Sequence, residues 1–188
     1  MELKEYQKEL RHAYVRGGPG AIVSGLVWLA AGITAHFSSI ANGFAVLFFA
    51  GMCIFPLSKV VLKIFFDRAP ESKGNPGGLV VIETVFPMIG CLFAAWLLLP
   101  HRPEFVFPIS AIAVGAHYFG FRTAYGDWTY WLFGGIVCLI GALSIILNIP
   151  PREFVAFLIA AIEIIFGCFF ILADRRLGTS LNETGESP

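Results

Sequence analysis

The stretch EFVAFLIAAIEIIFGCFFILA (residues 153–173) decides the fold class. After its first residue it is apolar except for Glu163, which lies in its middle. About 20 apolar residues form a helix long enough to cross the ~30 Å hydrocarbon core of a membrane. The stretch therefore predicts a transmembrane helix that carries an ionisable group roughly 15 Å from either end.

Five more apolar stretches precede this one, and Pro-, Gly- and Asn-containing turns separate them. Of the 188 residues, 57% are hydrophobic and only 14% are charged, whereas a soluble domain carries roughly a quarter charged residues. This composition excludes a soluble globular enzyme, a disordered chain and a nucleic-acid binder. We predict an all-α polytopic membrane protein with six transmembrane helices arranged as three hairpins. The predicted spans are 18–38, 43–66, 77–99, 104–121, 128–148 and 153–173.

The predicted spans divide the chain into three parts. Residues 1–16 form an N-terminal amphipathic cytoplasmic segment, 17–173 the six-helix transmembrane domain and 174–188 a polar cytoplasmic tail. In the first part, Leu3, Tyr6, Leu10 and Ala13 recur at helical spacing. This pattern is typical of a helix in the membrane interface or of a short solvated helix. Its mixed charge and the long apolar run after it argue against a cleavable signal peptide.

Basic residues predict the orientation in the membrane. Of the 13 Lys and Arg residues, only Arg102 and Arg152 fall on one side of the predicted membrane. Because basic loops stay in the cytoplasm, the other side is predicted to be cytoplasmic, and both termini with it. The other eleven are Lys4, Lys8, Arg11, Arg16, Lys59, Lys63, Arg68, Lys73, Arg122, Arg175 and Arg176.

The four cysteines all lie inside apolar runs without CxxC spacing, which favours neither a zinc site nor a disulfide framework. We expect them to pack as small apolar residues, and we expect no metal and no cofactor. They are Cys53, Cys91, Cys138 and Cys168.

Glu83, His117 and Glu163 are the ionisable side chains that lie inside predicted spans. A charge at the centre of a membrane helix costs about 2.5–3.5 kcal/mol or more, so such residues face the bundle interior or water and are candidate functional groups. Each one lies on a stripe of small residues, which predicts an interior helix face. The stripes are Ala156, Ala160, Glu163 and Gly167; Glu83, Pro87, Gly90 and Ala94; and Ser110, Ala113, His117, Gly120 and Ala124.

Depth separates these candidates into two sets. Glu83, His117, Tyr118 and Arg122 are predicted to form one polar group near the cytoplasmic side. A histidine beside a carboxylate suits proton transfer or pH sensing, and a purely structural hydrogen-bond network is the alternative. Glu163 lies deeper, and no cation is expected at its depth.

Aromatic residues and prolines add two expectations. Tyr125, Trp128, Tyr130 and Trp131 are predicted to anchor the bundle at the membrane interface. Trp28 lies near mid-bilayer, where it is either a packing residue or a cavity wall. The prolines inside spans are predicted to kink their helices; they are Pro56, Pro87 and Pro108.

Three hypotheses for function follow. The first is a membrane protein, such as a transporter or channel, that moves or senses a small solute or proton, with Glu163 in mid-membrane and Glu83 and His117 on the cytoplasmic route. The second is a membrane-embedded enzyme that acts on a lipidic substrate at the cytoplasmic interface, although no nucleophile motif supports it. The third is a structural or partner-binding subunit. Expected partners are the lipid bilayer, a small solute or proton, and a second copy in a homo-oligomer; no nucleic acid is expected.

Several strings resemble an uncharacterised bacterial family of small six-span membrane proteins, a domain of unknown function. This resemblance implies a bacterial cytoplasmic (inner) membrane location and supplies no activity. The last hairpin is also similar to the HdeD-like acid-resistance membrane proteins through Gly126-Asp-Trp128, Gly134-Gly-Ile136 and Ile162-Glu-Ile-Ile-Phe166. The strings of the first resemblance are Gly18-Pro-Gly20, Ser24-Gly-Leu-Val-Trp28, Phe55-Pro-Leu-Ser58, Gly74-Asn-Pro76 with Glu83-Thr84, Arg102-Pro-Glu104 and Phe107-Pro108.

Overall fold

A computed structural model describes the backbone of residues 2–147 and 153–184, and side chains as far as residue 176. Over these residues the chain is helical and contains no strand, which confirms the all-α prediction. Five helices are long and apolar enough to cross a membrane, and a bent pair makes a sixth span if it is counted as one. The five are α2 (Gly18–Phe37), α5 (Pro76–Leu98), α6 (Val106–Tyr125), α7 (Thr129–Ile146) and α8 (Phe154–Thr184).

The bent pair consists of α3 (Ile40–Gly51) and α4 (Ile54–Phe65), which meet at an angle of 54°. The stretch predicted as one span over 43–66 is therefore two helices, with a bend where Pro56 was predicted to kink the helix. Pro56 has no N–H to bond the carbonyl of Met52, one turn earlier, so the helix breaks there. The two short 3-10 helices are η1 (Val15–Gly17) and η2 (Pro103–Phe105).

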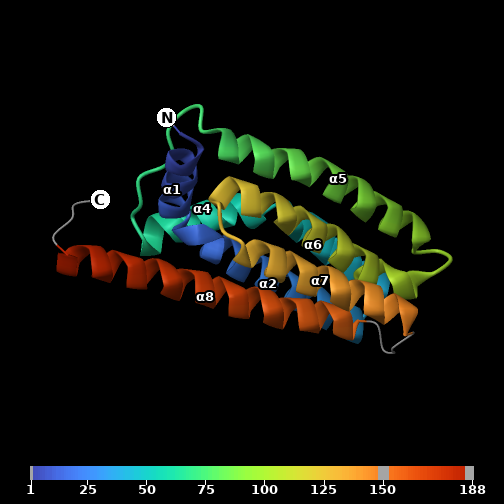
Figure 1. Ribbon diagram of the computed structural model, residues 1–188. Helices are drawn as coiled ribbons and strands as arrows, with labels where there is room; N and C mark the ends of the chain where they lie inside the picture. The colour runs from blue at the N-terminus through green and yellow to red at the C-terminus, as the bar shows by residue number, and fades with distance from the viewer. Residues whose placement is uncertain (1, 148–152, 185–188) are drawn as a thin grey trace.

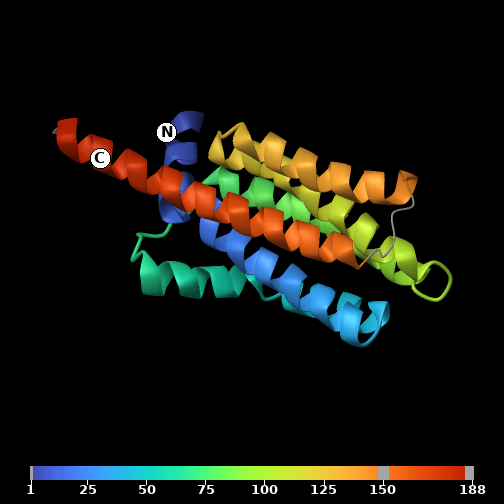
Figure 2. The same cartoon turned by 90° about the horizontal axis from the view of Figure 1, so that it is seen from below.

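Two antiparallel helix pairs form the centre of the bundle. The helix α8 lies along α2, and α7 lies along α6 (Figures 1 and 2). The pair α3 and α4 flanks α2, while α5 lies on the outer side of α6. The helices of the third predicted hairpin, α7 and α8, follow one another in the chain. However, α7 packs mainly against α6, and α8 packs mainly against α2.

Glycines explain which helices pair. Gly18, Gly25 and Gly32 recur every seven residues along the face of α2 that meets α8. A Cβ on Gly25 would lie 2.9 Å from the carbonyl oxygen of Ala160, and one on Gly141 would lie 2.5 Å from that of Pro108. Small residues let helix backbones approach closely. The stripe predicted on α8 accordingly does face the interior, with Ala156, Ala160, Glu163 and Gly167 buried.

The stripe predicted on α5 faces the wrong way. Glu83, Pro87, Gly90 and Ala94 are all exposed. The residues of α5 that are buried against the bundle include Leu92 and Ala95. The small residue that allows α5 to approach α6 belongs to α6, because a Cβ on Gly120 would lie 2.5 Å from Thr84.

The amphipathic segment forms helix α1 (Leu3–Ala13), which runs crosswise over one end of the bundle (Figure 1). We refer to this end as the α1 end. Leu10 and Ala13 are buried there, and Gln7 Nε2 donates a 2.9 Å hydrogen bond to the carbonyl of Thr123 at the end of α6. The helix is therefore packed against the bundle on its apolar side.

Candidate functional site

Glu163 is the best-enclosed ionisable group of the described residues, with 0% of its surface exposed. The hydroxyl of Tyr118 on α6 donates a 2.7 Å hydrogen bond to its Oε1. Ser24 on α2 lies beside the same two side chains. The other carboxyl oxygen, Oε2, is buried and has no hydrogen-bond partner among the described residues. We call Glu163, Tyr118 and Ser24 the carboxyl site.

Close helix packing places these three side chains together. Gly25 brings α2 against Ala160 of α8, so that Ser24, one position earlier, reaches the level of Glu163. Tyr118 comes from α6, which also contacts α8. No Lys, Arg or His of the described chain pairs with Glu163. The carboxyl group of Glu163 is therefore accompanied by two hydroxyl groups and by no positively charged side chain of the residues that the structure describes.

Aromatic rings separate the carboxyl site from the α1 end. Tyr118 stacks on Phe133 with ring centroids 4.2 Å apart, and Phe133 stacks on Phe166 at 4.6 Å. One turn nearer the α1 end, Tyr130 stacks on Phe170 at 4.7 Å. We call Phe133, Phe166, Tyr130 and Phe170 the aromatic layer. Because Phe133, Tyr130 and Phe170 are almost completely buried, this layer closes the bundle on that side.

Trp28 lies on α2 one turn beyond Ser24, on the side away from the aromatic layer. Its side chain is 1% exposed, and its ring packs against Phe107 at a centroid distance of 6.3 Å. These contacts describe a packed side chain, so the carboxyl site lies between aromatic groups on both sides.

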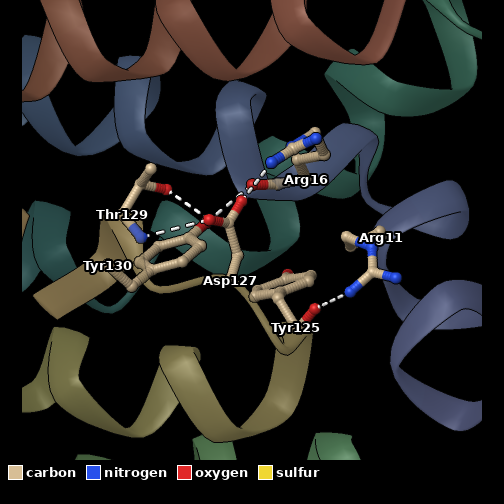
Figure 3. A network of polar contacts seen from close by, with 6 residues as sticks. All are labelled: Arg11, Arg16, Tyr125, Asp127, Thr129 and Tyr130. Atoms are coloured by element: carbon tan, nitrogen blue, oxygen red, sulfur yellow. Dashed lines mark hydrogen bonds and ion pairs between the residues drawn. The ribbon is translucent and has the colours of Figure 1, made fainter. Parts of the chain in front are cut away.

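A polar network joins the start of α2 to the α6–α7 turn (Figure 3). Arg16 forms an ion pair with Asp127 through Nη2. Thr129 donates to Asp127 Oδ1 from its backbone N–H at 3.1 Å and from its hydroxyl at 2.7 Å. Tyr130 donates its hydroxyl to the backbone carbonyl of Arg16 at 2.6 Å. Arg11 of α1 donates to the backbone carbonyl of Tyr125.

The backbone of this network is unusual. Val15, Arg16 and Gly17 have φ values of 49°, 53° and 78°, three consecutive left-handed residues that turn the chain from α1 into α2. Left-handed backbone is strained for Val and Arg and persists only where surrounding contacts fix it. The contacts of Arg16 with Asp127 and Tyr130 fix the backbone in this way.

The same contacts change the acidity of Asp127, which lies between α6 and α7. Burial by itself would raise the pKa of Asp127. The hydrogen bonds from Thr129 and the ion pair with Arg16 outweigh that effect and hold the pKa below its ordinary value. Asp127 is therefore an ionised side chain that fixes the turn at the α1 end.

The predicted group of Glu83, His117, Tyr118 and Arg122 does not form. The hydroxyl of Thr84, and not the Glu83 carboxylate, shares a 2.7 Å hydrogen bond with His117 Nδ1. Successive helical residues point about 100° apart, so that Tyr118 turns to Glu163 while His117 faces α5. Arg122 is exposed and lies over the ring of Trp131 at 5.1 Å. Glu83 is exposed and has no side-chain partner in the described part of the chain.

His117 borders a small cavity between α5 and α6 with a volume of about 120 Å³. The cavity lies on the α5 side of α6, whereas the carboxyl site lies on its α8 side. Among residues 2–147 and 153–176, no three His, Cys, Asp or Glu side chains are placed to hold a metal ion. The other cavity walls are Thr84, Pro87, Met88, Cys91, Ala113 and Ala116.

Sequence reasoning missed Ser24, Arg16 and Asp127 as interacting groups. Asp127 did carry a signal, since Asp shortly before a helix that begins at Thr129 is a typical N-terminal capping residue. Arg16 carried none beyond its positive charge, because its partner comes from a distant turn. The four predicted interface anchors fall into two sets. Trp128 and Trp131 are exposed, whereas Tyr125 and Tyr130 are buried in the bundle.

Comparison with known proteins gives a family and no activity. The model of a family of unknown function, DUF7010, matches residues 3–173. The chain therefore belongs to this family, as the resemblance to an uncharacterised membrane family predicted. No curated protein and no solved structure matches the chain.

Proposed function

We propose that this family member binds a proton at Glu163 in the middle of its helical bundle, and that it moves this proton across the membrane or responds to it. The observation that carries the proposal is the enclosed carboxyl group with one oxygen, Oε2, that lacks a hydrogen-bond partner. An isolated carboxylate is expensive to bury. A proton on Oε2 removes that charge without any change in the surrounding helices.

The neighbours of Glu163 fit both protonation states. Tyr118 donates to Oε1 in either state, and hydrogen bonds to an ionised carboxylate are about twice as strong as those between neutral groups. The hydroxyl of Ser24 lies close enough to serve the same carboxyl. Two hydroxyl groups therefore support the charged state during the exchange of a proton.

The path toward the α1 end passes through the aromatic layer and reaches the network of Arg16 and Asp127. In the arrangement described here this layer is closed, so proton exchange with that side requires the rings of Phe133 and Phe166 to move. Glu83 and His117, which were expected on this route, lie on the other side of α6 and take no part in the proposal.

The other two hypotheses find less support. An enzyme site built from Glu83 and His117 requires these side chains to converge with Arg122, and the three have different partners or none. A purely structural role remains the direct competitor, in which the Tyr118–Glu163 hydrogen bond only ties α6 to α8. The test must therefore detect a proton and not merely a loss of stability.

The test uses purified protein in liposomes that contain a pH-sensitive dye, with the membrane potential clamped by valinomycin and potassium. Under an imposed pH gradient we expect faster proton movement than in protein-free liposomes, and Glu163→Gln should bring it to the background rate. Glu83→Gln is the matched control, because it is the same substitution on an exposed face of another membrane helix. We expect Glu83→Gln to retain the activity.

A second readout covers a protein that responds to a proton without moving it. Infrared difference spectra between acidic and alkaline samples should show a carboxylic C=O band that Glu163→Gln lacks and Glu83→Gln keeps. If Glu163→Gln changes neither the proton flux nor the spectrum, and only lowers the unfolding temperature, Glu163 is structural and the proposal is wrong.

A further inference from the structure

A cavity of about 300 Å³ lies between η1 and α8 at the α1 end, away from the carboxyl site. Arg16 of η1 forms one wall, and residues of α8 form the rest. Counted from the first of them, the α8 residues lie three, four and seven positions along the chain, which places them on one face of the helix. They are Phe169, Leu172, Ala173 and Arg176.

The cavity has a polar end and an apolar end. Arg176 lies seven residues beyond Phe169, roughly 10 Å along the helix axis. Phe169 and Leu172 are also exposed on the outside of the bundle, where 47% and 55% of their surfaces are accessible. The apolar end therefore continues into the surface of α8 that faces the hydrocarbon of a membrane.

Arg16 retains unused hydrogen-bonding capacity at this cavity. Its Nη2 pairs with Asp127, but its Nε is buried without a hydrogen-bond partner among the described residues. The side chain is only 16% exposed, so water solvates this donor poorly. The part of the Arg16 side chain that remains accessible borders the cavity, where it can meet an anion.

Positive charge is in excess around the cavity. Arg11 lies close enough to interact electrostatically with both Arg16 and Asp127. Arg176 is exposed and has no ion-pair partner in the described part of the chain, and Asp174 on the same turn of α8 is held by Arg68 at 2.9 Å. Both charged residues that line the cavity are therefore arginines, and only Arg16 has a carboxylate partner among the described residues, so an anion would balance the charge of Arg176.

We propose that this cavity binds the phosphate group of an anionic ligand between Arg16 and Arg176, with the apolar part of that ligand against Phe169 and Leu172. Guanidinium groups suit phosphate because they donate hydrogen bonds in a planar fork. Basic pockets between membrane helices are known to bind anionic headgroups. The apolar end favours an anionic glycerophospholipid over inorganic phosphate, which shares only the charge. This proposal rests on different residues from the proposed function.

The experiment titrates short-chain phosphatidylglycerol into the protein in a zwitterionic detergent and follows the unfolding temperature, which rises when a ligand binds the folded state. We expect a rise with phosphatidylglycerol and none with phosphatidylcholine of the same chain length. Arg176→Gln should weaken the apparent affinity at least about tenfold, the effect of losing one hydrogen bond to a charged group. Ala173→Phe should weaken it as well, because the ring fills the cavity without a change of charge.

Arg175→Gln is the matched control, since it removes the same charge from the neighbouring position, which does not line the cavity. We expect it to change the affinity less than twofold. Equal shifts with the two lipids, or equal losses in Arg175→Gln and Arg176→Gln, would overturn the proposal in favour of non-specific surface charge. Inorganic phosphate at the same concentration forms a separate arm. If it reproduces the shift and Arg176→Gln abolishes it, the phosphate site stands and the lipid assignment is wrong.

Discussion

At the scale of single residues, Asp127 determines how the α1 end depends on pH. The pKa of Asp127 is held below its ordinary value of about 3.9 by Thr129 and Arg16. A carboxyl with a lowered pKa stabilises the fold above the pKa of its unfolded state, and this contribution is lost as the pH falls through the folded-state pKa. The pH window for this loss therefore lies below about pH 4.

We predict that Asp127→Asn lowers the free energy of unfolding at neutral pH by about 1–3 kcal/mol, because Arg16 loses its ionised partner. Below pH 4 the wild type should lose stability more steeply than the variant, so the two unfolding temperatures should converge. Thermal unfolding in detergent between pH 3 and pH 7 measures both effects.

Asp67→Asn is the control for this prediction, because Asp67 is exposed and its side chain has no described hydrogen bond. An exposed substitution of this kind should change stability by less than about 0.5 kcal/mol. A parallel fall in the wild type and Asp127→Asn at acidic pH would show that another group causes the acid sensitivity.

Single residues also show how far the sequence determines the site. An acidic residue in the middle of an apolar run was enough to identify Glu163 as a buried group. Its partner Tyr118 was expected in the group of Glu83, His117 and Arg122, because the position of Tyr118 beside His117 in the chain says nothing about which helix each one faces. That choice depends on the packing of α6 between α5 and α8, which a single sequence does not contain.

At the scale of helices, glycine contacts hold the two central pairs together. Gly141 and Gly135 lie on the same helix, but a Cβ at Gly141 would lie 2.5 Å from the carbonyl oxygen of Pro108, while a Cβ at Gly135 would meet nothing within 4 Å. The two positions therefore separate the effect of helix packing from that of helix propensity.

We predict that Gly141→Ala lowers the free energy of unfolding by about 1–3 kcal/mol, because α6 and α7 must move apart. Gly135→Ala should be neutral or should stabilise the protein by up to about 1 kcal/mol, since Ala is the better helix former. Unfolding temperatures of the two variants in one detergent test this difference, and equal destabilisation would contradict the described contact.

Helix positions were predictable from hydropathy, whereas helix faces were predictable only in part. The stripe on α8 was assigned correctly because the small residues of α2 meet it. The stripe on α5 was assigned incorrectly because the chain contains 20 glycines, and small residues occur on more than one face of a helix. Pro56 indicated an irregularity between α3 and α4, but proline alone does not indicate whether a helix bends or stops.

At the scale of the whole molecule, the distribution of basic residues predicts an orientation in the membrane. Eleven of the 13 basic residues belong to the α1 end, so the positive-inside rule places this end in the cytoplasm. Lys73 precedes α5 at the α1 end, and His101 follows it at the opposite end; both side chains are exposed.

We predict that a membrane-impermeant maleimide added to intact cells labels His101→Cys and not Lys73→Cys, each in a cysteine-free background. After the membrane is permeabilised, both variants should react. Labelling of Lys73→Cys in intact cells would place the α1 end outside the cell and would reverse the predicted topology.

The pairing of α2 with α8 has a consequence for synthesis of the protein. The ribosome completes α2 early and α8 only after every other membrane-spanning helix described here. During that interval the glycine face of α2 has no permanent partner, and contacts between distant parts of a chain form slowly. The nascent chain must therefore remain in the membrane in an open arrangement, and a ribosome stalled before α8 would leave an intermediate suited to recognition by quality-control proteases.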